Sequence, residues 1–322
     1  MKGGHPYLRF FARRLGAFVL VVWVVEIATF LMVRLIPGDP ARLVLGARAS
    51  QQSVEKLHHE LGLDQPLLSQ YWHYTVNALH FNFGESFTSH VPVSTELSTR
   101  IGNELELIGV AVALVLLMGV GFGMLAGALT SNGKHPALEH VFVFITGVLG
   151  SVPGYVAATL LALVFAVTLK VLPVGGNEGP DSVILPAFSI AIPQAALLAR
   201  IVRVETLGVL SQNYVRAARS KRLPRRAIYG RYVLPNVLTA ALTLGGTVFA
   251  QSIGSAIIVE TVFAWNGLGL LLTQAVLRLN FPVVQGAALL LALIVVLVNA
   301  FVDLAVSVID PRSAAQRGLE LA

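Results

Sequence analysis

The sequence predicts an all-α polytopic membrane protein with six membrane-spanning helices. Of its 322 residues, 55% are hydrophobic and only 12% are charged, whereas soluble domains carry about a quarter charged residues. A chain of this length could not cover itself with a water-soluble surface. Its apolar residues also form runs that are long enough to cross a hydrocarbon core of ~30 Å. The lack of cysteine excludes disulfide frameworks, thiolate catalysis and Cys-ligated metal sites.

Six apolar segments supply the predicted spans. They cover residues 15–36, 107–129, 141–169, 183–199, 234–259 and 279–302. Five contain no Asp, Glu, Lys or Arg, and the first contains only Glu26 and Arg34. The segment 141–169 is long for a straight crossing at about 1.5 Å per residue. Its Gly-Ser-Val-Pro-Gly run at 150–154 predicts a break.

The basic residues predict the orientation of the chain. With six spans, both termini and two loops share one side, and that side holds 16 of the 23 Lys and Arg. The positive-inside rule therefore places both termini in the cytoplasm. The expected organisation is a cytoplasmic tail (1–14), a first transmembrane helix (15–36), an extracytoplasmic loop region (37–103), a five-helix core (104–309) with a cytoplasmic loop (202–233), and a cytoplasmic tail (310–322).

The extracytoplasmic region is long and polar. A helix is expected over 51–61, and the aromatic run Tyr-Trp-His-Tyr follows at 71–74. Five histidines lie in this region, at positions 58, 59, 73, 80 and 90. Because they form no i,i+4 pair with a supporting acid, we expect solvated surface histidines and not a nickel pathway.

The cytoplasmic loop is strongly basic and patterned for helices. Counted from Arg200, it has nine Lys and Arg against one acid, Glu205. Asn213 can cap a helix over 214–221, and Pro224 suits the first turn of a second helix over 225–233. Topogenic charge beside anionic lipid explains many basic loops. A helix–turn–helix between two spans is more structure than such a signal requires.

The spacing within this loop resembles that of a known family. ABC importer permeases carry the loop consensus Glu-Ala-Ala, three residues, Gly, nine residues, Ile-x-Leu-Pro. This chain has Arg-Ala-Ala at 216–218, Arg222 in place of the Gly, and Tyr-Val-Leu-Pro at 232–235. Gly suits a turn because it tolerates positive φ, which is costly for Arg.

The resemblance covers nearly the whole chain and narrows to the permeases of dipeptide, oligopeptide and nickel importers. Similar segments are Leu-Ile-Pro-Gly-Asp-Pro at 35–40, Leu-Gly-Leu-Asp-Gln-Pro-Leu at 61–67, Asn-Phe-Gly-Glu-Ser at 82–86, Leu-Pro-Ala at 185–187, Leu-Ala-Arg at 198–200, Glu-Thr-Val-Phe at 260–263, Gly-Leu-Gly at 267–269 and Asp-Pro-Arg at 310–312.

This resemblance implies a type I ABC importer permease fold in the bacterial cytoplasmic membrane and a peptide importer, with nickel or heme as open alternatives. It implies as partners a second homologous permease subunit, two cytoplasmic ABC ATPases and an extracytoplasmic solute-binding protein, besides membrane lipids and no nucleic acid. The implied ATPase-coupling residues are Tyr214, Arg216, Ala217, Ala218, Arg219, Lys221, Arg222, Leu223, Pro224, Leu234 and Pro235.

We expect ATP and Mg to be bound by the partner ATPases and no cofactor, metal or catalytic site in this chain. The segment from Gly127 to Gly133-Lys134 superficially resembles a phosphate-binding loop. It has five intervening residues where four are needed, and His135 replaces the required Ser or Thr. The chain is therefore not expected to be an enzyme.

Polar residues in or at the ends of the predicted spans, together with Pro153 at the predicted break, are candidates for the translocation pathway or for structural pairs, because polar and irregular segments must face protein or water. The set is Glu26, Ser151, Pro153, Gln251, Glu260, Asn299 and Asp303. A proton-coupled secondary transporter using Glu26 and Asp303 is the alternative function, although neither acid belongs to a denser relay. Gly119, Gly123 and Gly127 predict a face for close helix packing.

Overall fold

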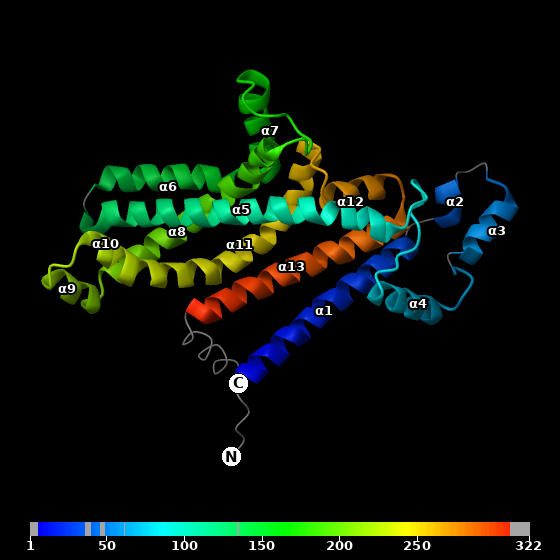
Figure 1. The fold of residues 1–322 in the computed structure, drawn as a ribbon, viewed down its shortest axis with the longest axis horizontal. Helices are drawn as coiled ribbons and strands as arrows, with labels where there is room; N and C mark the ends of the chain where they lie inside the picture. Colours follow the sequence, from blue (N-terminus) through cyan, green and yellow to red (C-terminus); the bar gives the residue numbers. More distant parts are fainter. Residues whose placement is uncertain (1–5, 36–39, 46–48, 61, 134, 310–322) are drawn as a thin grey trace, which may run out of the picture. The chain divides into compact units, whose positions relative to one another are not determined.

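Helices are the only regular elements in the described part of the chain, apart from one isolated bridge between Glu85 and Pro92 (Figure 1). The computed structural model describes residues 6–35, 40–45, 49–60, 62–133 and 135–309. The chain divides into two units, which are described separately below. The first comprises residues 1–10, 105–265 and 297–322, and the second comprises residues 11–104 and 266–296.

The α-helices, in chain order, are α1 (Pro6–Leu35), α2 (Pro40–Leu45), α3 (Gln51–Glu60), α4 (Leu67–Leu79), α5 (Val93–Thr130), α6 (Pro136–Ser151), α7 (Gly154–Leu161), α8 (Ile184–Leu210), α9 (Asn213–Ser220), α10 (Arg225–Ile228), α11 (Leu234–Phe263), α12 (Leu268–Leu277) and α13 (Phe281–Ile309). Two 3₁₀ segments, Ser131–Gly133 and Pro180–Val183, precede α6 and α8. Two π-helical segments, Ala162–Thr168 and Tyr229–Val233, follow α7 and α10.

Within its described residues, the protein is an all-helical membrane protein with three to five candidate spans. Three helical stretches are long and apolar enough to cross a bilayer: Val93–Thr130, Pro180–Leu210 and Phe281–Phe301. Two broken pairs raise the number to five, namely α6 with α7 and the end of α11 with α12. The apolar part of α1, Gly16–Met32, is shorter. All six predicted apolar segments lie largely on helices.

Helix ends differ from the predicted membrane boundaries. α5 begins at Val93, well before the apolar segment that starts at 107, and α8 continues to Leu210 through the first part of the predicted 202–233 loop. α1 begins at Pro6, inside the predicted tail. The physical reason is that charged residues mark where hydrocarbon ends, but they do not terminate a helix.

The predicted break near residue 153 is confirmed. α6 ends at Ser151, α7 begins at Gly154, and the two helical stretches are bent by 98°. Pro153 has ψ 143° and Val152 has ψ 121°, both extended. Proline has no N–H to donate to the helix and disfavours the helical conformation of the residue before it, so the chain turns here.

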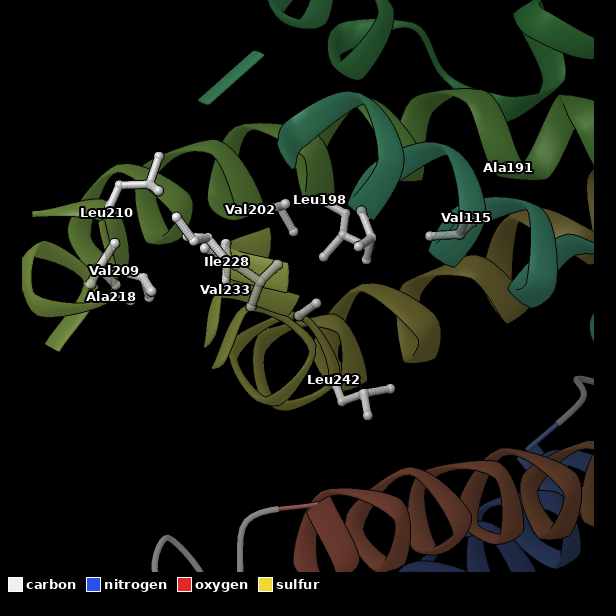
Figure 2. Close-up of a cluster of buried hydrophobic side chains, with 14 residues drawn as sticks. Val115, Ala191, Leu198, Val202, Val209, Leu210, Ala218, Ile228, Val233 and Leu242 are labelled. Atoms are coloured by element: carbon white, nitrogen blue, oxygen red, sulfur yellow. The ribbon is translucent and has the colours of Figure 1, made fainter. Parts of the chain in front are cut away.

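In the first unit, α8 packs against α6, α7 and α11, and the glycine face of α5 lies directly on it. A Cβ atom at Gly119, Gly123 or Gly127 would lie 2.8, 2.6 or 2.7 Å from side-chain atoms of Leu198, Val202 or Thr206, respectively. Only glycine permits this approach, which confirms the predicted small-residue packing face. Side chains from α8 and its neighbours form a buried cluster (Figure 2).

In the second unit, Asn280 anchors the segment between α4 and α5. Its Nδ2 donates to Ser86 Oγ at 2.8 Å and to Thr88 Oγ1 at 3.0 Å, and its Oδ1 accepts from Phe87 N at 3.1 Å. Asn280 and Ser86 are buried. Glu104 on α5 accepts from Leu268 N at 2.9 Å, at the first turn of α12. These polar contacts fix the short segments of this unit to its long helices.

Candidate functional site

The chain between α8 and α11 folds as a helix–turn–helix, which we call the basic loop (residues 213–235). α9 is followed by a short turn and by α10, which continues through the π-helical segment into α11. The two predicted helices are therefore confirmed. The predicted cap is wrong: Asn213 is inside α9, and Gln212 occupies the N-cap position without a side-chain cap bond. Pro224 precedes α10 with φ −63° and ψ 148°.

One face of the basic loop is anchored in the buried cluster. Val215 and Ala218 of α9 are 0% and 4% exposed, and they belong to the same cluster as Val209 and Leu210 at the end of α8. In Figure 2, Val209, Ala218, Ile228 and Val233 lie close to one another. Because only two residues separate α8 from α9, this packing makes the loop a rigid extension of α8.

The other face is exposed and cationic. Residues 213–235 contain seven Lys and Arg and no Asp or Glu. The exposed members of the predicted site are Tyr214, Arg216, Ala217, Arg219, Lys221, Arg222, Leu223, Pro224 and Pro235. Ala218 and Leu234 instead pack in or against the cluster, so they anchor the loop. The loop thus offers a rigid, single-sign surface to an acidic partner.

The turn after α9 is a Schellman motif with arginine at the position that glycine usually occupies. Leu223 N donates to Ala218 O at 3.3 Å, and Arg222 N donates to Arg219 O at 2.9 Å. These are the 6→1 and 5→2 bonds of that motif. Arg222 has φ +55°, in the left-handed region. The geometry therefore keeps the turn that the family consensus Gly would make, and the arginine backbone bears the strain.

Two aromatic rings connect the two arms of the loop. The ring centroids of Tyr214 on α9 and Tyr232 on the π-helical segment are 6.3 Å apart, with the planes tilted by 32°. Tyr214 is 44% exposed, and Leu223 at the turn is 37% exposed. The cationic surface therefore also contains apolar side chains that a partner can cover.

Sequence reasoning missed a buried cation next to this loop. Arg203 on α8 is 8% exposed, and its Nη2 lies 2.7 Å from Glu139 Oε1 on α6. Its Nε donates to Thr130 Oγ1 at 3.2 Å, and its guanidinium carbon lies 5.9 Å from the Phe142 ring centroid. Arg203 was counted among the charges of the loop, and only the fold reveals that it joins α8 to α5 and α6.

Two family models match the chain. The model described as "Binding-protein-dependent transport system inner membrane component" covers residues 119–314, and its N-terminal counterpart covers residues 7–108. The chain belongs to this family. It is thus a multi-pass inner-membrane permease subunit, a kind of subunit that does not itself hydrolyse ATP. Such a system also includes ATPase and solute-binding partners, and the family description indicates no cofactor for this chain.

Curated relatives match the permease over almost its full length. A protein of Brucella abortus (strain 2308), provisionally named a peptide transport system permease protein, is 36% identical over 314 residues, which cover 93% of this chain and 97% of the relative. The glutathione transport system permease protein GsiC of Escherichia coli (strain K12) is 34% identical over 304 residues, which cover 94% and 98%.

The break in the permease between α6 and α7 forms an open groove of about 590 Å³ that contains two predicted pathway residues. Ser151 and Pro153 line it among apolar side chains, including Phe144 and Val148. Ser151 Oγ donates to Gly147 O at 2.8 Å, so its hydroxyl is engaged with its own helix. The groove is therefore an apolar surface at the bend between α6 and α7.

The other predicted pathway residues of the permease are not gathered in one place. Glu26 on α1 accepts a short hydrogen bond from Thr75 on α4, which fits a structural pair. Glu260 near the end of α11 is fully buried, and its carbonyl accepts from Trp265 N at 2.9 Å. The side chains of Gln251 and Asp303 lie outside the described residues, so the expected pairing of Asp303 with Asn299 stays a prediction.

Proposed function

We propose that the chain is the membrane subunit of an ATP-driven importer of peptides, with six spans and both termini in the cytoplasm. Its partners would be a second homologous permease, two cytoplasmic ABC ATPases and an extracytoplasmic solute-binding protein. Family membership and relatives named for peptide and glutathione transport support this assignment. Membership in a binding-protein-dependent family also disfavours the proton-coupled alternative that would use Glu26 and Asp303.

The basic loop is proposed as the surface that receives the ATPase. The observation that carries this proposal is the combination of seven cations, no acid and a buried apolar anchor in one short helix–turn–helix. A loop that merely marked topology would need the charges but not the anchor. Because α9 is tied to α8, a displacement of the loop would move α8, and α8 packs on α6, α7 and α11. The bend between α6 and α7 at Pro153 would then move with α8.

The coupling role is tested with the complete transporter in proteoliposomes. Arg219→Glu combined with Arg222→Glu reverses two exposed charges of the basic loop, and we expect ATP hydrolysis to become uncoupled from uptake while insertion is retained. Arg278→Glu, an exposed arginine just after α12, is the matched control. If the double variant keeps both uptake and association with the ATPases, the loop is not the coupling surface.

The peptide substrate is tested separately, by mass spectrometry of the ligand released from the cognate binding protein. Di- or oligopeptides, including glutathione-like tripeptides, are the expected result. Recovery of nickel chelates or heme would overturn the peptide assignment and leave the permease assignment intact. Uptake of the identified ligand by proteoliposomes that contain the full transporter, and none when the binding protein is left out, would connect the ligand to this chain.

A further inference from the structure

Helix α4 has one side that packs against α1 (Figure 1). The Tyr71 ring meets the Phe30 ring edge-on with centroids 5.2 Å apart, and Tyr74 Oη lies 3.0 Å from Thr29 Oγ1. Thr75 donates to the Glu26 carboxylate. These three contacts hold α4 against α1, at the stretch of α1 between residues 26 and 30.

A second side of α4 is an exposed apolar stripe. Leu68, Trp72 and Leu79 are 84%, 67% and 74% exposed, and Val76 lies on the same side. At 3.6 residues per turn, these four positions fall within a narrow sector that is adjacent to the α1-facing side. Large apolar side chains gathered in this way mark a surface that is covered in the working protein.

The third side of α4 is polar. It carries Ser69, Gln70, His73 and Asn77, and the whole helix Leu67–Leu79 contains no Asp, Glu, Lys or Arg. A helix with an exposed apolar stripe that includes a tryptophan, and a polar side next to it, has the pattern of a segment that lies in a membrane–water interface. The missing charges remove the groups that would resist insertion.

The position of the contact on α1 agrees with this pattern. α1 continues for nine residues beyond Glu26, to Leu35, a length of about 14 Å at 1.5 Å per residue. Val19, Leu20, Trp23 and Val24, immediately before the contact, are large, apolar and about half exposed, as lipid-facing residues of a span are. α4 therefore crosses α1 in the outer half of the predicted span 15–36, within the last two turns of the apolar stretch Gly16–Met32 and next to exposed apolar residues.

We propose that α4 lies in the membrane–water interface and inserts its Leu68–Trp72–Val76–Leu79 stripe among the acyl chains, so that its partner is the lipid surface itself. This inference rests on α1 being a span, as in the proposed function. A solute-binding protein fits the stripe less well, because it must dock and leave. Each departure would expose this charge-free apolar surface to water.

The chain contains no cysteine, so single cysteines can report on each side of α4. Leu68→Cys, Trp72→Cys and Leu79→Cys would be spin-labelled in the complete transporter, reconstituted in phosphatidylethanolamine–phosphatidylglycerol vesicles without binding protein. We expect a several-fold higher collision rate with oxygen than with a water-soluble nickel chelate at all three positions. Asn77→Cys, on the polar side, is the matched control and should show the reverse order.

Two other outcomes would overturn the proposal, and a third would overturn only the proposed function. High access to the nickel chelate at the stripe, lost only when the binding protein is added, would make the stripe a protein-docking surface. Low access to both reagents would place the second permease over it. If uptake fails while the stripe still favours oxygen, the proposed function is wrong and the membrane placement of α4 stands.

Discussion

Arg222 adopts a left-handed backbone conformation that glycine would adopt freely, so Arg222→Gly is expected to stabilise the turn of the basic loop. A left-handed conformation costs a non-glycine residue roughly 1–2 kcal/mol. The greater freedom of glycine in the unfolded chain returns about 0.5–1 kcal/mol of this. The net gain is ~0.5–1 kcal/mol, which is a roughly two- to fivefold smaller opening constant for the turn.

Hydrogen exchange in the assembled transporter measures this opening at the amides that close the Schellman motif, Arg222 N and Leu223 N. Exchange at the amide of Leu223 should slow by the stated factor in Arg222→Gly. Arg222→Ala is the matched control, because it removes the same charge and keeps a Cβ atom at φ +55°. Equal slowing in both variants would mean that charge repulsion, and not backbone strain, limits the turn.

Three further predictions concern packing. Gly123→Ala should lower the melting temperature of the purified complex, since the new methyl would lie 2.6 Å from α8 and overpacking costs ~1–3 kcal/mol. Gly121→Ala should leave the melting temperature unchanged, because no atom lies within 4 Å of its new methyl. Equal effects of the two variants would contradict the packing argument. Glu139→Ala leaves the Arg203 guanidinium buried beside Thr130. The free energy of unfolding should fall by an amount between the ~1 kcal/mol of an exposed ion pair and the ~3 kcal/mol of a buried one, because the Glu139 side chain is 43% exposed. Urea unfolding measures this change, and an unchanged midpoint would mean that the pair contributes nothing. Asn280→Ala removes three hydrogen bonds and should speed proteolysis of residues 84–92 by destabilising them ~1–3 kcal/mol, whereas an unchanged cleavage rate would assign their order to other contacts.

The local backbone conformation could be predicted from the sequence where a single residue determines it. Proline 153 has no N–H to donate, so the break of the third apolar segment could be predicted to within a few residues. The glycine face of α5 was equally readable, because a four-residue period of glycines has few uses besides close approach. The consensus glycine indicated a positive φ after α9, but Arg222 in its place argued against that turn; the structure nevertheless keeps it, with Arg222 at φ +55°.

What could not be predicted depends on residues far apart in the chain. Arg203 and Glu139 are separated by more than 60 residues, and nothing in either segment indicates the other. The contact between Glu26 and Thr75 was hidden for the same reason, although a hydrogen-bonding partner for an acid in a span was expected. The predicted cap was displaced by one residue, because Asn213 has a favoured capping side chain but is itself the first residue of α9.

The π-helical segment Tyr229–Val233 sets a limit on how the length of this chain can vary. Ile228 and Val233 both point into the buried cluster, yet they are five residues apart, and five residues of α-helix would turn them about 140° away from each other. A π turn, closed by i→i+5 hydrogen bonds, accommodates one extra residue and restores their common side. Deleting Gly230 would therefore convert the turn to ordinary α-helix and keep α11 in register. One residue deleted or inserted later in α11 would instead rotate the rest of that helix by about 100°.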